Sequence, residues 1–398
     1  MNVPKLRFKE FNDEYNITKV NEIVDVIDGD RGNKYPKEND FYESEFCLFL
    51  NAGNVTKNGF NFKNNQFITK EKDEKLRKGK LLINDIILTT RGTVGNVAWF
   101  NEKIPYKNIR INSGMVINRI KKNGHLLPEY LYSYMKTPVF ETQVNKVNYG
   151  SAQPQLTVSS INNFNIQYPT INEQKKVSTL MLLLDKKIEL QTKKIEDLKL
   201  FKKGLINHII KNIETEKIPL KNILVEQNHK TKKNNEYEIL SSTSKGLYLQ
   251  KDYFNKQAAS DNNVGYKILK KNQLVLSPQN LWMGNININS KYNIGIVSPS
   301  YKIFDINNNI DIDFFDYWIK SPKALYEYKI SSEQGASIVR RNLNMNLFYE
   351  IKVDIPKGKI QNKIGKIIKL LNLKIQYNEN SLQKLQEFKK GLMQNMFI

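Results

Sequence analysis

The 398-residue chain has few residues suited to metal binding or covalent catalysis, with one cysteine, Cys47, and three histidines. A single cysteine excludes a disulfide framework and a cysteine-rich metal site. The histidines, His125, His208 and His229, are far apart in the sequence, and we interpret His208 as a solvated residue in the tail of a helix. The sequence therefore offers no candidate catalytic residue and no candidate metal ligand.

Long apolar runs and cofactor motifs are missing as well. No stretch approaches the roughly 18 uncharged apolar residues of a membrane span, and the start, MNVPKLRFKEF, has no apolar run of the kind found in signal peptides. The sequence contains no GxxxxGK[ST] phosphate loop and no glycine-rich strand–turn–helix signature for a nucleotide or methyl donor. These absences predict a cytoplasmic, non-catalytic protein that carries no cofactor or metal of its own and has no contact with a membrane.

Positive charge is what the chain has in excess. Lysine and arginine total 62 against 40 acidic residues, which gives a net charge of +22. Such a surplus points to an anionic partner, first of all nucleic acid. A composition rich in Lys, Asn and Ile is also typical of AT-rich coding sequence, so charge alone leaves open a coiled-coil scaffold with no specificity for DNA.

The chain repeats itself. The segment FKKGL at 201–205 recurs at 388–392, a shift of 187 residues, and the same shift superposes Gln174 on Gln361 and Pro169 on Pro356. With small gaps the similarity extends upstream: NDIILTTRGTVGNVAWF (84–100) matches NQLVLSPQNLWMGNINI (272–288), and YGSAQPQL (149–156) matches QGASIVRR (334–341). The chain therefore consists of two similar halves, each a globular part followed by a helix.

Each predicted helix carries a heptad pattern of apolar residues. The central seam residues are Leu184, Ile188, Gln191, Ile195 and Leu198 in the first helix, and Leu371, Ile375, Asn378, Leu382 and Leu385 in the second. A polar residue interrupts the seam at matching places, Gln191 with Asn378 and Lys202 with Lys389. We favour a register role for Gln191 and Asn378, and for the two lysines a register role and a solvent-facing position stand as equal alternatives.

These patterns predict an α+β fold with a pseudo-twofold internal repeat, in which two similar globular domains are separated by long helices that form an antiparallel coiled coil. The predicted segments are 1–165 and 215–352 for the globular domains, and 166–214 and 353–398 for the helical spacers. At about 1.5 Å per residue each helix would be roughly 57 Å long. Such a rod could hold two DNA-reading domains about one helical turn apart.

The best candidates for DNA contacts are polar side chains beside glycines in the repeated loops and the scarce arginines. Amide and guanidinium groups read base edges, and basic groups hold phosphates. The candidate residues are Arg31, Arg91, Thr93, Arg110, Gln279, Asn280, Trp282, Arg340 and Arg341. For each of them a surface or packing role is an equal alternative. The loops TTRGTVG and SPQNLWMG differ, so the two domains are expected to read different half-sites.

The layout resembles the specificity (S) subunit of Type I restriction-modification enzymes. The resemblance lies in VPKLRFKEF, TTRGTVG, GIVSPSYKIF, the final FKKGLMQNMF and the helical segment YPTINEQKKVSTLMLLLDKKIELQTKKIEDLKLFKKGL. The family's helix motif is complete in the first copy at Pro169, Glu173, Gln174, Asp185, Lys187 and Ile188. The second copy keeps Pro356, Gln361, Lys374 and Ile375, and departs at Ile360 and Asn372.

The resemblance implies two target-recognition domains that each read half of a bipartite double-stranded DNA site. The helices would space these domains and dock two modification (methyltransferase) subunits, and restriction subunits would join the complex. S-adenosylmethionine, ATP and Mg²⁺ would then act on the partner subunits and not on this chain. The open alternatives are the coiled-coil scaffold and an enzyme with an unrecognised nuclease site.

Overall fold

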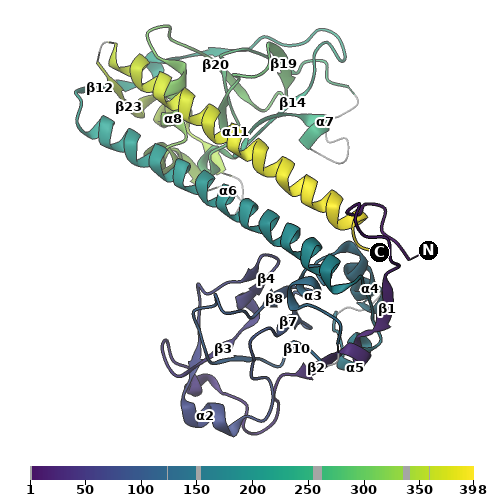
Figure 1. The fold of residues 1–398 in the computed structure, drawn as a ribbon. Helices are drawn as coiled ribbons and strands as arrows, with labels where there is room; N and C mark the ends of the chain where they lie inside the picture. Colours follow the sequence, from purple (N-terminus) through teal and green to yellow (C-terminus); the bar gives the residue numbers. More distant parts are fainter. Residues whose placement is uncertain (1, 123, 149–153, 254–261, 335–340, 358) are drawn as a thin grey trace. The chain divides into compact units, whose positions relative to one another are not determined.

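The computed structural model describes residues 1–398 except 1, 123, 149–153, 254–261, 335–340 and 358 (Figure 1). It divides into two compact units, unit 1 (Met1–Lys193 with Asn380–Ile398) and unit 2 (Lys194–Glu379). The helix α6 (Ile171–Lys211) begins in unit 1 and ends in unit 2, and α11 (Ile360–Asn395) runs from unit 2 into unit 1. The fold is α+β, as predicted. The compact units differ from the four predicted segments because each globular part packs with a section of both long helices.

Unit 1 is built around a four-stranded antiparallel sheet in the order β2-β10-β7-β8. A second sheet has the order β6-β3-β9, with β3 and β9 parallel. The strands are β1 (Asn16–Lys19), β2 (Val24–Asp28), β3 (Cys47–Leu50), β4 (Val55–Thr56), β5 (Gly59–Phe60), β6 (Phe67–Ile68), β7 (Ile86–Thr89), β8 (Val97–Trp99), β9 (Ile109–Ile111), β10 (Met115–Ile120) and β11 (Asn165–Tyr168). The helices are α1 (Val20–Ile23), η1 (Glu38–Asp40), η2 (Ala52–Asn54), α2 (Lys70–Lys75), α3 (Pro128–Tyr134), α4 (Pro138–Asn148) and α5 (Val158–Asn162).

Unit 2 repeats this plan, with a four-stranded antiparallel sheet in the order β13-β20-β17-β18 and smaller strand pairs beside it. Its strands are β12 (Thr215–Pro219), β13 (Leu224–Gln227), β14 (Leu240–Thr243), β15 (Gly246–Leu249), β16 (Lys267–Lys270), β17 (Leu274–Leu276), β18 (Ile286–Ile288), β19 (Ile294–Val297), β20 (Lys302–Ile306), β21 (Ser332–Gln334), β22 (Arg341–Leu343) and β23 (Lys352–Pro356). Its helices are η3 (Leu220–Asn222), α7 (Gln250–Tyr253), η4 (Leu281–Met283), α8 (Ile312–Ile319), α9 (Pro322–Ile330) and α10 (Met345–Glu350).

The central strands of both sheets are buried on both faces. In β7, Ile86 and Leu88 point into a core shared with α3, α4 and α6, while Ile87 points into a second core under β3 and β9. Period-two alternation therefore fills two apolar layers at once, which explains the uninterrupted apolar run in NDIILTT. Strand β17 repeats the arrangement with Leu274 and Leu276 on one side and Val275 on the other.

The turn before each central strand is also repeated. Asn84 (φ 76°) and Asn272 (φ 67°) both have the left-handed backbone that asparagine tolerates better than most residues. The residue after each one caps the turn, since Asp85 accepts a hydrogen bond from the Leu82 N–H and Gln273 accepts one from the Lys270 N–H, both at 2.7 Å. The sequence match at 84–100 and 272–288 thus corresponds to one backbone geometry used twice.

The long helices pack antiparallel within each unit. In unit 1, Asp185 of α6 forms an ion pair with Lys389 of α11, and Leu392 and Met396 of α11 share a core with Val177 of α6. In unit 2, the Lys202 ammonium donates to Asn372 Oδ1 at 2.8 Å, and Ile206 shares a core with Ile364 and Ile368. The ten central seam residues named above are all buried or half-buried. The register role of Gln191 and Asn378 stays a prediction.

Both ends of the chain are built into unit 1. The Leu6 N–H donates to the Asn395 carbonyl at 2.9 Å, and the Phe397 ring lies 5.6 Å from that of Tyr130. Arg7 donates to both carboxylate oxygens of Glu173 at 2.8 and 2.7 Å. In unit 2 the position equivalent to Glu173 is Ile360. Unit 2 has no free N-terminal segment like the one that carries Arg7, because its first strand, β12, follows α6 in the chain. The departure from the repeat at Ile360 therefore coincides with this change in connectivity.

A glutamine at the start of each long helix anchors the segment that precedes an aromatic-rich helix, α3 in unit 1 and α8 in unit 2, which we call the aromatic helix of each unit. Gln174 accepts from the Leu127 N–H and donates to the His125 carbonyl, both at 2.8 Å. Gln361 makes the same pair of bonds to the Asp311 N–H (3.1 Å) and the Asn309 carbonyl (2.7 Å). A glutamine amide is suited to this task because it donates and accepts at once.

Changing Gln174 to methionine is expected to lower the free energy of unfolding by about 1–3 kcal/mol, because it leaves buried backbone groups without partners. The loss should be smaller for Gln361→Met, because Gln361 is half-buried while Gln174 is fully buried. Urea unfolding of the two variants measures both losses. Equal losses would contradict the link to burial.

Candidate nucleic-acid interface

In unit 1 the predicted reading loop after β7 meets the segment that leads into α5. The Leu156 N–H donates to the Thr90 carbonyl at 3.0 Å, and Arg91 and Gln155 form an isolated antiparallel bridge. We call residues 90–96 together with 154–156 loop pair 1. The two glycine-containing segments that the sequence repeat singled out separately are therefore neighbours in space.

The base of loop pair 1 is fixed and its tip is exposed. Gly95 has a left-handed backbone (φ 93°), which favours glycine. Asn96 donates from its backbone N–H to Thr89 Oγ1 at 2.9 Å and from its side chain to the Val55 carbonyl at 3.1 Å. Arg91 and Thr93 are exposed between these anchors. The loop thus presents a guanidinium and a hydroxyl on a rigid base, as a DNA-reading loop requires.

Arg31 approaches the same part of unit 1. Its guanidinium donates to the Ser113 carbonyl at 3.4 Å and forms an ion pair with Asp28 at 2.9 Å. The Arg91 N–H donates to the carbonyl of the next residue, Gly114, at 3.3 Å. The turn at 112–114 therefore brings Arg31 and Arg91 together, although 60 residues separate them in the sequence.

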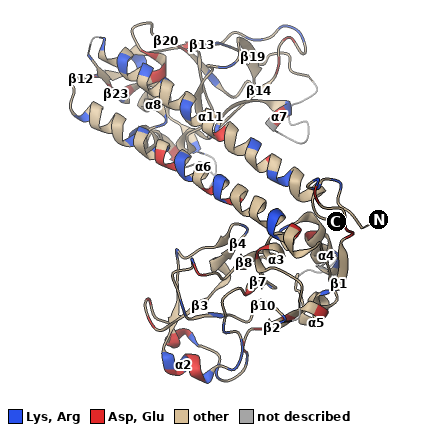
Figure 2. Cartoon of the chain, viewed as in Figure 1, with Lys and Arg blue, Asp and Glu red and all other residues tan. Residues whose placement is uncertain are grey.

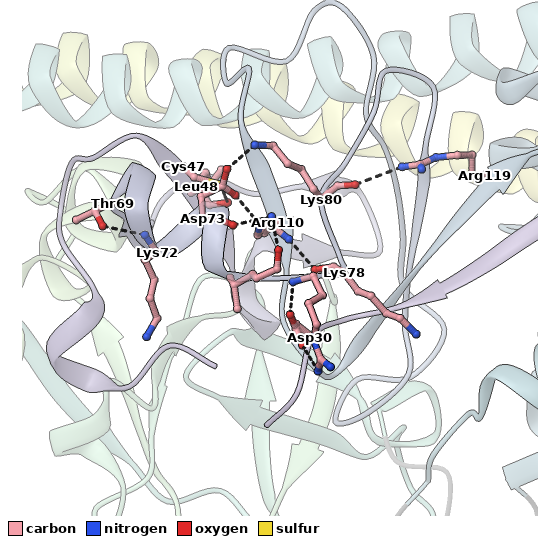
Figure 3. A network of polar contacts seen from close by, with 12 residues as sticks. Asp30, Cys47, Leu48, Thr69, Lys72, Asp73, Lys78, Lys80, Arg110 and Arg119 are labelled. Carbon is pink, nitrogen blue, oxygen red and sulfur yellow. Dashed lines mark hydrogen bonds and ion pairs between the residues drawn. The ribbon is translucent and has the colours of Figure 1, made fainter. Parts of the chain in front are cut away.

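Arg110 lies elsewhere and must be removed from the candidate contacts. Its guanidinium is buried, forms an ion pair with Asp73, and donates to the carbonyls of Lys78 at 2.7 Å and Leu76 at 3.1 Å (Figure 3). Lys80 completes the cluster with a second ion pair to Asp73. The prediction of a DNA contact at Arg110 is wrong because its guanidinium is buried and already bonded to Asp73 and to backbone carbonyls of unit 1.

The buried cysteine lies beside this cluster. Burial, together with the neighbouring Asp73 carboxylate, raises the pKa of the Cys47 thiol to about 12. Such a thiol stays protonated at neutral pH and is a poor nucleophile.

In unit 2 the equivalent loop meets the strand β22. The Arg341 N–H donates to the Gln279 carbonyl at 3.2 Å, and the Arg341 guanidinium lies 4.9 Å from the centroid of the Trp282 ring. Residues 277–285 and 341–343 form loop pair 2. Four predicted residues, Gln279, Asn280, Trp282 and Arg341, belong to this pair, whereas Arg340 lies outside the described residues. The side chain of Gln279 is exposed and those of the other three are half-buried.

The sequence analysis missed the residues that hold these loops. Gly284 (φ 84°) and Asn285 repeat the roles of Gly95 and Asn96, and the Asn285 side chain donates to the Ser242 carbonyl at 3.0 Å. The signal was present, because a Gly-Asn dipeptide ends both aligned loops, in TVGNV and LWMGNI. An asparagine side chain can read a base or anchor a loop, and the sequence pattern does not distinguish the two roles.

Among the residues that the structure describes, no group of three or more His, Cys, Asp or Glu side chains could hold a metal ion. In that part of the chain no helix is both long and apolar enough to cross a bilayer.

Comparisons with known proteins agree with this arrangement. The model of the Type I restriction modification DNA specificity domain matches residues 12–200. The MjaIX specificity subunit of a Type I restriction enzyme from Methanocaldococcus jannaschii is 33% identical over 127 residues, which cover 31% of this chain and 28% of that protein. The MjaVIII specificity subunit from the same organism is 24% identical over 226 residues, 55% of this chain and 50% of that protein. The matches thus span half or less of these curated relatives.

Solved structures share the fold over almost the whole chain. The S subunit of a Type I restriction-modification system from M. genitalium superposes with a TM-score of 0.61 at 16% identity and covers 100% of this chain and 99% of that chain. A chain from a type I restriction-modification assembly gives a TM-score of 0.53 at 10% identity, with 95% and 96% covered. Both likenesses concern the fold.

Proposed function

Because the chain belongs to the family of Type I restriction-modification specificity subunits, we propose that it recognises a bipartite double-stranded DNA target, one half-site per unit. It would dock modification subunits, which methylate adenine, and restriction subunits, and it would carry out no catalysis itself. S-adenosylmethionine, ATP and Mg²⁺ would be bound by these partners.

One observation carries the proposal: a loop that ends in Gly-Asn is paired with a second segment in both units, but the side chains of the two loop pairs differ. Arg91 and Thr93 occupy the exposed tip of loop pair 1, and Gln279, Trp282 and Arg341 form loop pair 2. Similar loop pairs with different side chains suit two unlike half-sites. The net charge of +22 supplies the phosphate attraction common to both.

The deciding experiment is co-expression of the full chain with its candidate methyltransferase subunits, followed by mapping of methylated adenines in genomic DNA. We expect one bipartite motif with a fixed spacer. Exchanging residues 1–165 for the domain of a relative should change one half of this motif only. If both halves changed, the assignment of one half-site to each unit would be wrong. If the co-purified complex bound DNA without sequence preference at any salt concentration, the scaffold alternative would replace the proposal.

Repeated apolar residues on the long helices support a docking surface for the modification subunits. Leu183, Leu190 and Phe201 of α6 are 64%, 54% and 58% exposed, and the shift of 187 converts them into Leu370, Tyr377 and Phe388 of α11, at 67%, 74% and 56%. Figure 2 shows lysines and acidic residues along both helices. Exposed apolar groups at matching positions in both repeats fit one partner surface used twice.

Changing Leu183 and Leu190 together to aspartate is expected to reduce co-purification of modification subunits at least about 10-fold, because two buried apolar contacts would be lost at about 1.5–3 kcal/mol each. The matched control is Leu200→Asp. Leu200 is 68% exposed, but its counterpart in the repeat is Glu387, so it lies outside the repeated set. Equal losses in both variants would contradict a specific docking surface.

A further inference from the structure

The two lysines that interrupt the helical seam are held by matching partners. Lys389 forms an ion pair with Asp185 in unit 1, and Lys202 donates to Asn372 Oδ1 at 2.8 Å in unit 2. The shift of 187 converts Asp185 into Asn372 and Lys202 into Lys389. The two contacts are therefore the same contact, made once in each unit with the roles of α6 and α11 exchanged.

A second lysine at the end of the aromatic helix bonds to the contact in unit 1, and in unit 2 its counterpart and a neighbouring aspartate act on Lys202 electrostatically. In unit 1 the Lys136 ammonium donates to Asp185 Oδ2 at 3.3 Å and to the Tyr132 hydroxyl at 3.2 Å. The counterpart of Lys136 in unit 2 is Lys320, since KTP at 136–138 matches KSP at 320–322. Lys320 forms its ion pair with Asp316 at 2.7 Å.

The carboxylate that pairs with these lysines lies on a different element in each unit. In unit 1 it is Asp185 on α6, and the residue at the second position is Tyr132 on α3. In unit 2 the helix residue is the neutral Asn372, and Asp316 of α8 occupies the position equivalent to Tyr132. Each unit thus keeps two lysines and one carboxylate. Without that carboxylate the two largely buried ammonium groups of unit 1, whose side chains are 15% (Lys136) and 12% (Lys389) exposed, would lie together uncompensated.

The apolar seam alone defines the helix register poorly. Antiparallel helices with heptad repeats can slip by seven residues and still place apolar groups opposite one another. A slip of one heptad would bring Lys389 opposite Ser178 or Thr192, neither of which carries a charge. The side chain of Lys389 is only 12% exposed, so it would lose its partner without gaining water. The contact of Lys389 therefore penalises both slipped registers. In unit 2 a slip would bring Lys202 opposite Gly365 in one direction and Glu379 in the other, so its contact penalises only the first.

We propose that these residues form two register clamps, clamp 1 (Lys136, Asp185 and Lys389) and clamp 2 (Lys202, Asp316, Lys320 and Asn372). Clamp 1 disfavours both slipped registers of α6 against α11, and clamp 2 disfavours the one that places Lys202 opposite Gly365. Each clamp also ties the aromatic helix of its reading domain to the native register. On the proposed function, from which this inference follows, they are positioning residues that determine which spacer length between half-sites is accepted.

The test uses the full chain in complex with its methyltransferase partners and a set of DNA targets whose spacers are native, or up to about three base pairs shorter or longer. This range covers a slip of one heptad, which moves a helix by roughly 10.5 Å or about three base pairs. Asp185→Asn is expected to reduce the preference for the native spacer at least 10-fold while both half-site sequences are still required. Adding Tyr132→Asp builds the clamp 2 arrangement in unit 1 and should restore the preference. The control is Glu189→Gln, which removes an α6 carboxylate from an exposed pair with Lys186.

Unchanged spacer preference in a folded Asp185→Asn chain would overturn the proposal, as would failure of the added Tyr132→Asp to restore it. If Asp185→Asn gives no folded chain, the reciprocal change in unit 2 decides. Asp316→Tyr alone should then relax the spacer preference, and Asp316→Tyr with Asn372→Asp should retain it. Retained preference in the single variant, or lost preference in the double variant, would contradict the proposal. If the complex that contains the unchanged chain methylated no bipartite site, the proposed function itself would be refuted.

Discussion

A complex that contains the Arg341→Ala chain is expected to methylate its bipartite target about 5–150-fold more slowly, since a bidentate arginine–guanine contact contributes about 1–3 kcal/mol. Arg341 is chosen because its guanidinium is already oriented by the Trp282 ring, 4.9 Å away, and by the backbone bond to Gln279. Little side-chain entropy is then lost on binding. The rate is measured on targets in which each position of one half-site is varied.

Arg341→Lys distinguishes base reading from phosphate binding. Lysine keeps the charge but cannot form the bidentate contact. If Arg341 reads a base, the lysine variant should relax discrimination at one position of a single half-site and keep the salt dependence of binding. A uniform loss over all target sequences in both variants would assign Arg341 to the DNA backbone and contradict the reading role.

The largest stability effect is expected for Asp73→Asn, at about 3–5 kcal/mol, because the change leaves Arg110 as a buried charge without its counter-ion. The side chains of Asp73 and Arg110 are 2% and 6% exposed. Hydrogen exchange should show β3 and β9 losing protection while unit 2 keeps it. The control, Asp25→Asn, removes a 56% exposed carboxylate paired with Lys121 and should cost less than about 1 kcal/mol.

The pH dependence of this effect has a defined sign. Burial disfavours the charged carboxylate, but hydrogen bonds from Lys80 and Arg110 outweigh it and lower the pKa of Asp73. A carboxyl whose pKa is depressed by folding stabilises the protein above its unfolded pKa of about 3.9, and this contribution is lost as pH falls through the folded pKa. The difference in unfolding free energy between the wild type and Asp73→Asn should therefore be constant near neutrality and shrink below about pH 4.

Periodic and repeated features of this protein could be predicted from the sequence. The heptad pattern predicted a long helix in each of the segments 166–214 and 353–398, and α6 and α11 lie there. A shift of 187 residues superposes the apolar seam of one helix on that of the other. The repeated loops could be located too, because glycine and asparagine mark their ends. These features depend on residues close in sequence, and local propensity and periodicity determine them.

Features that depend on tertiary partners could not be predicted. Arg91 and Arg110 look alike in sequence, yet one is exposed on a loop and the other is buried against Asp73, 37 residues away. In the sequence, Asn372 is a position where the family's aspartate is missing. The carboxylate that replaces it, Asp316, lies on another helix, so the sequence does not reveal the link between the two. An arginine or a carboxylate has no periodicity that reveals its counter-ion, so its role becomes clear only when the fold brings the two together.

The assembly of unit 1 from both ends of the chain has a consequence for synthesis on the ribosome. Domains usually fold in the order in which they are made, the N-terminal one first. Here the core of unit 1 contains Leu392, Met396 and Phe397, whereas unit 2 is a continuous stretch from Lys194 to Glu379. Unit 2 can therefore complete its core while the nascent unit 1 still exposes apolar surface around Tyr130 and Val177. The half of the protein that is made first is the last to be finished, and until then its exposed surface is a natural substrate for chaperones.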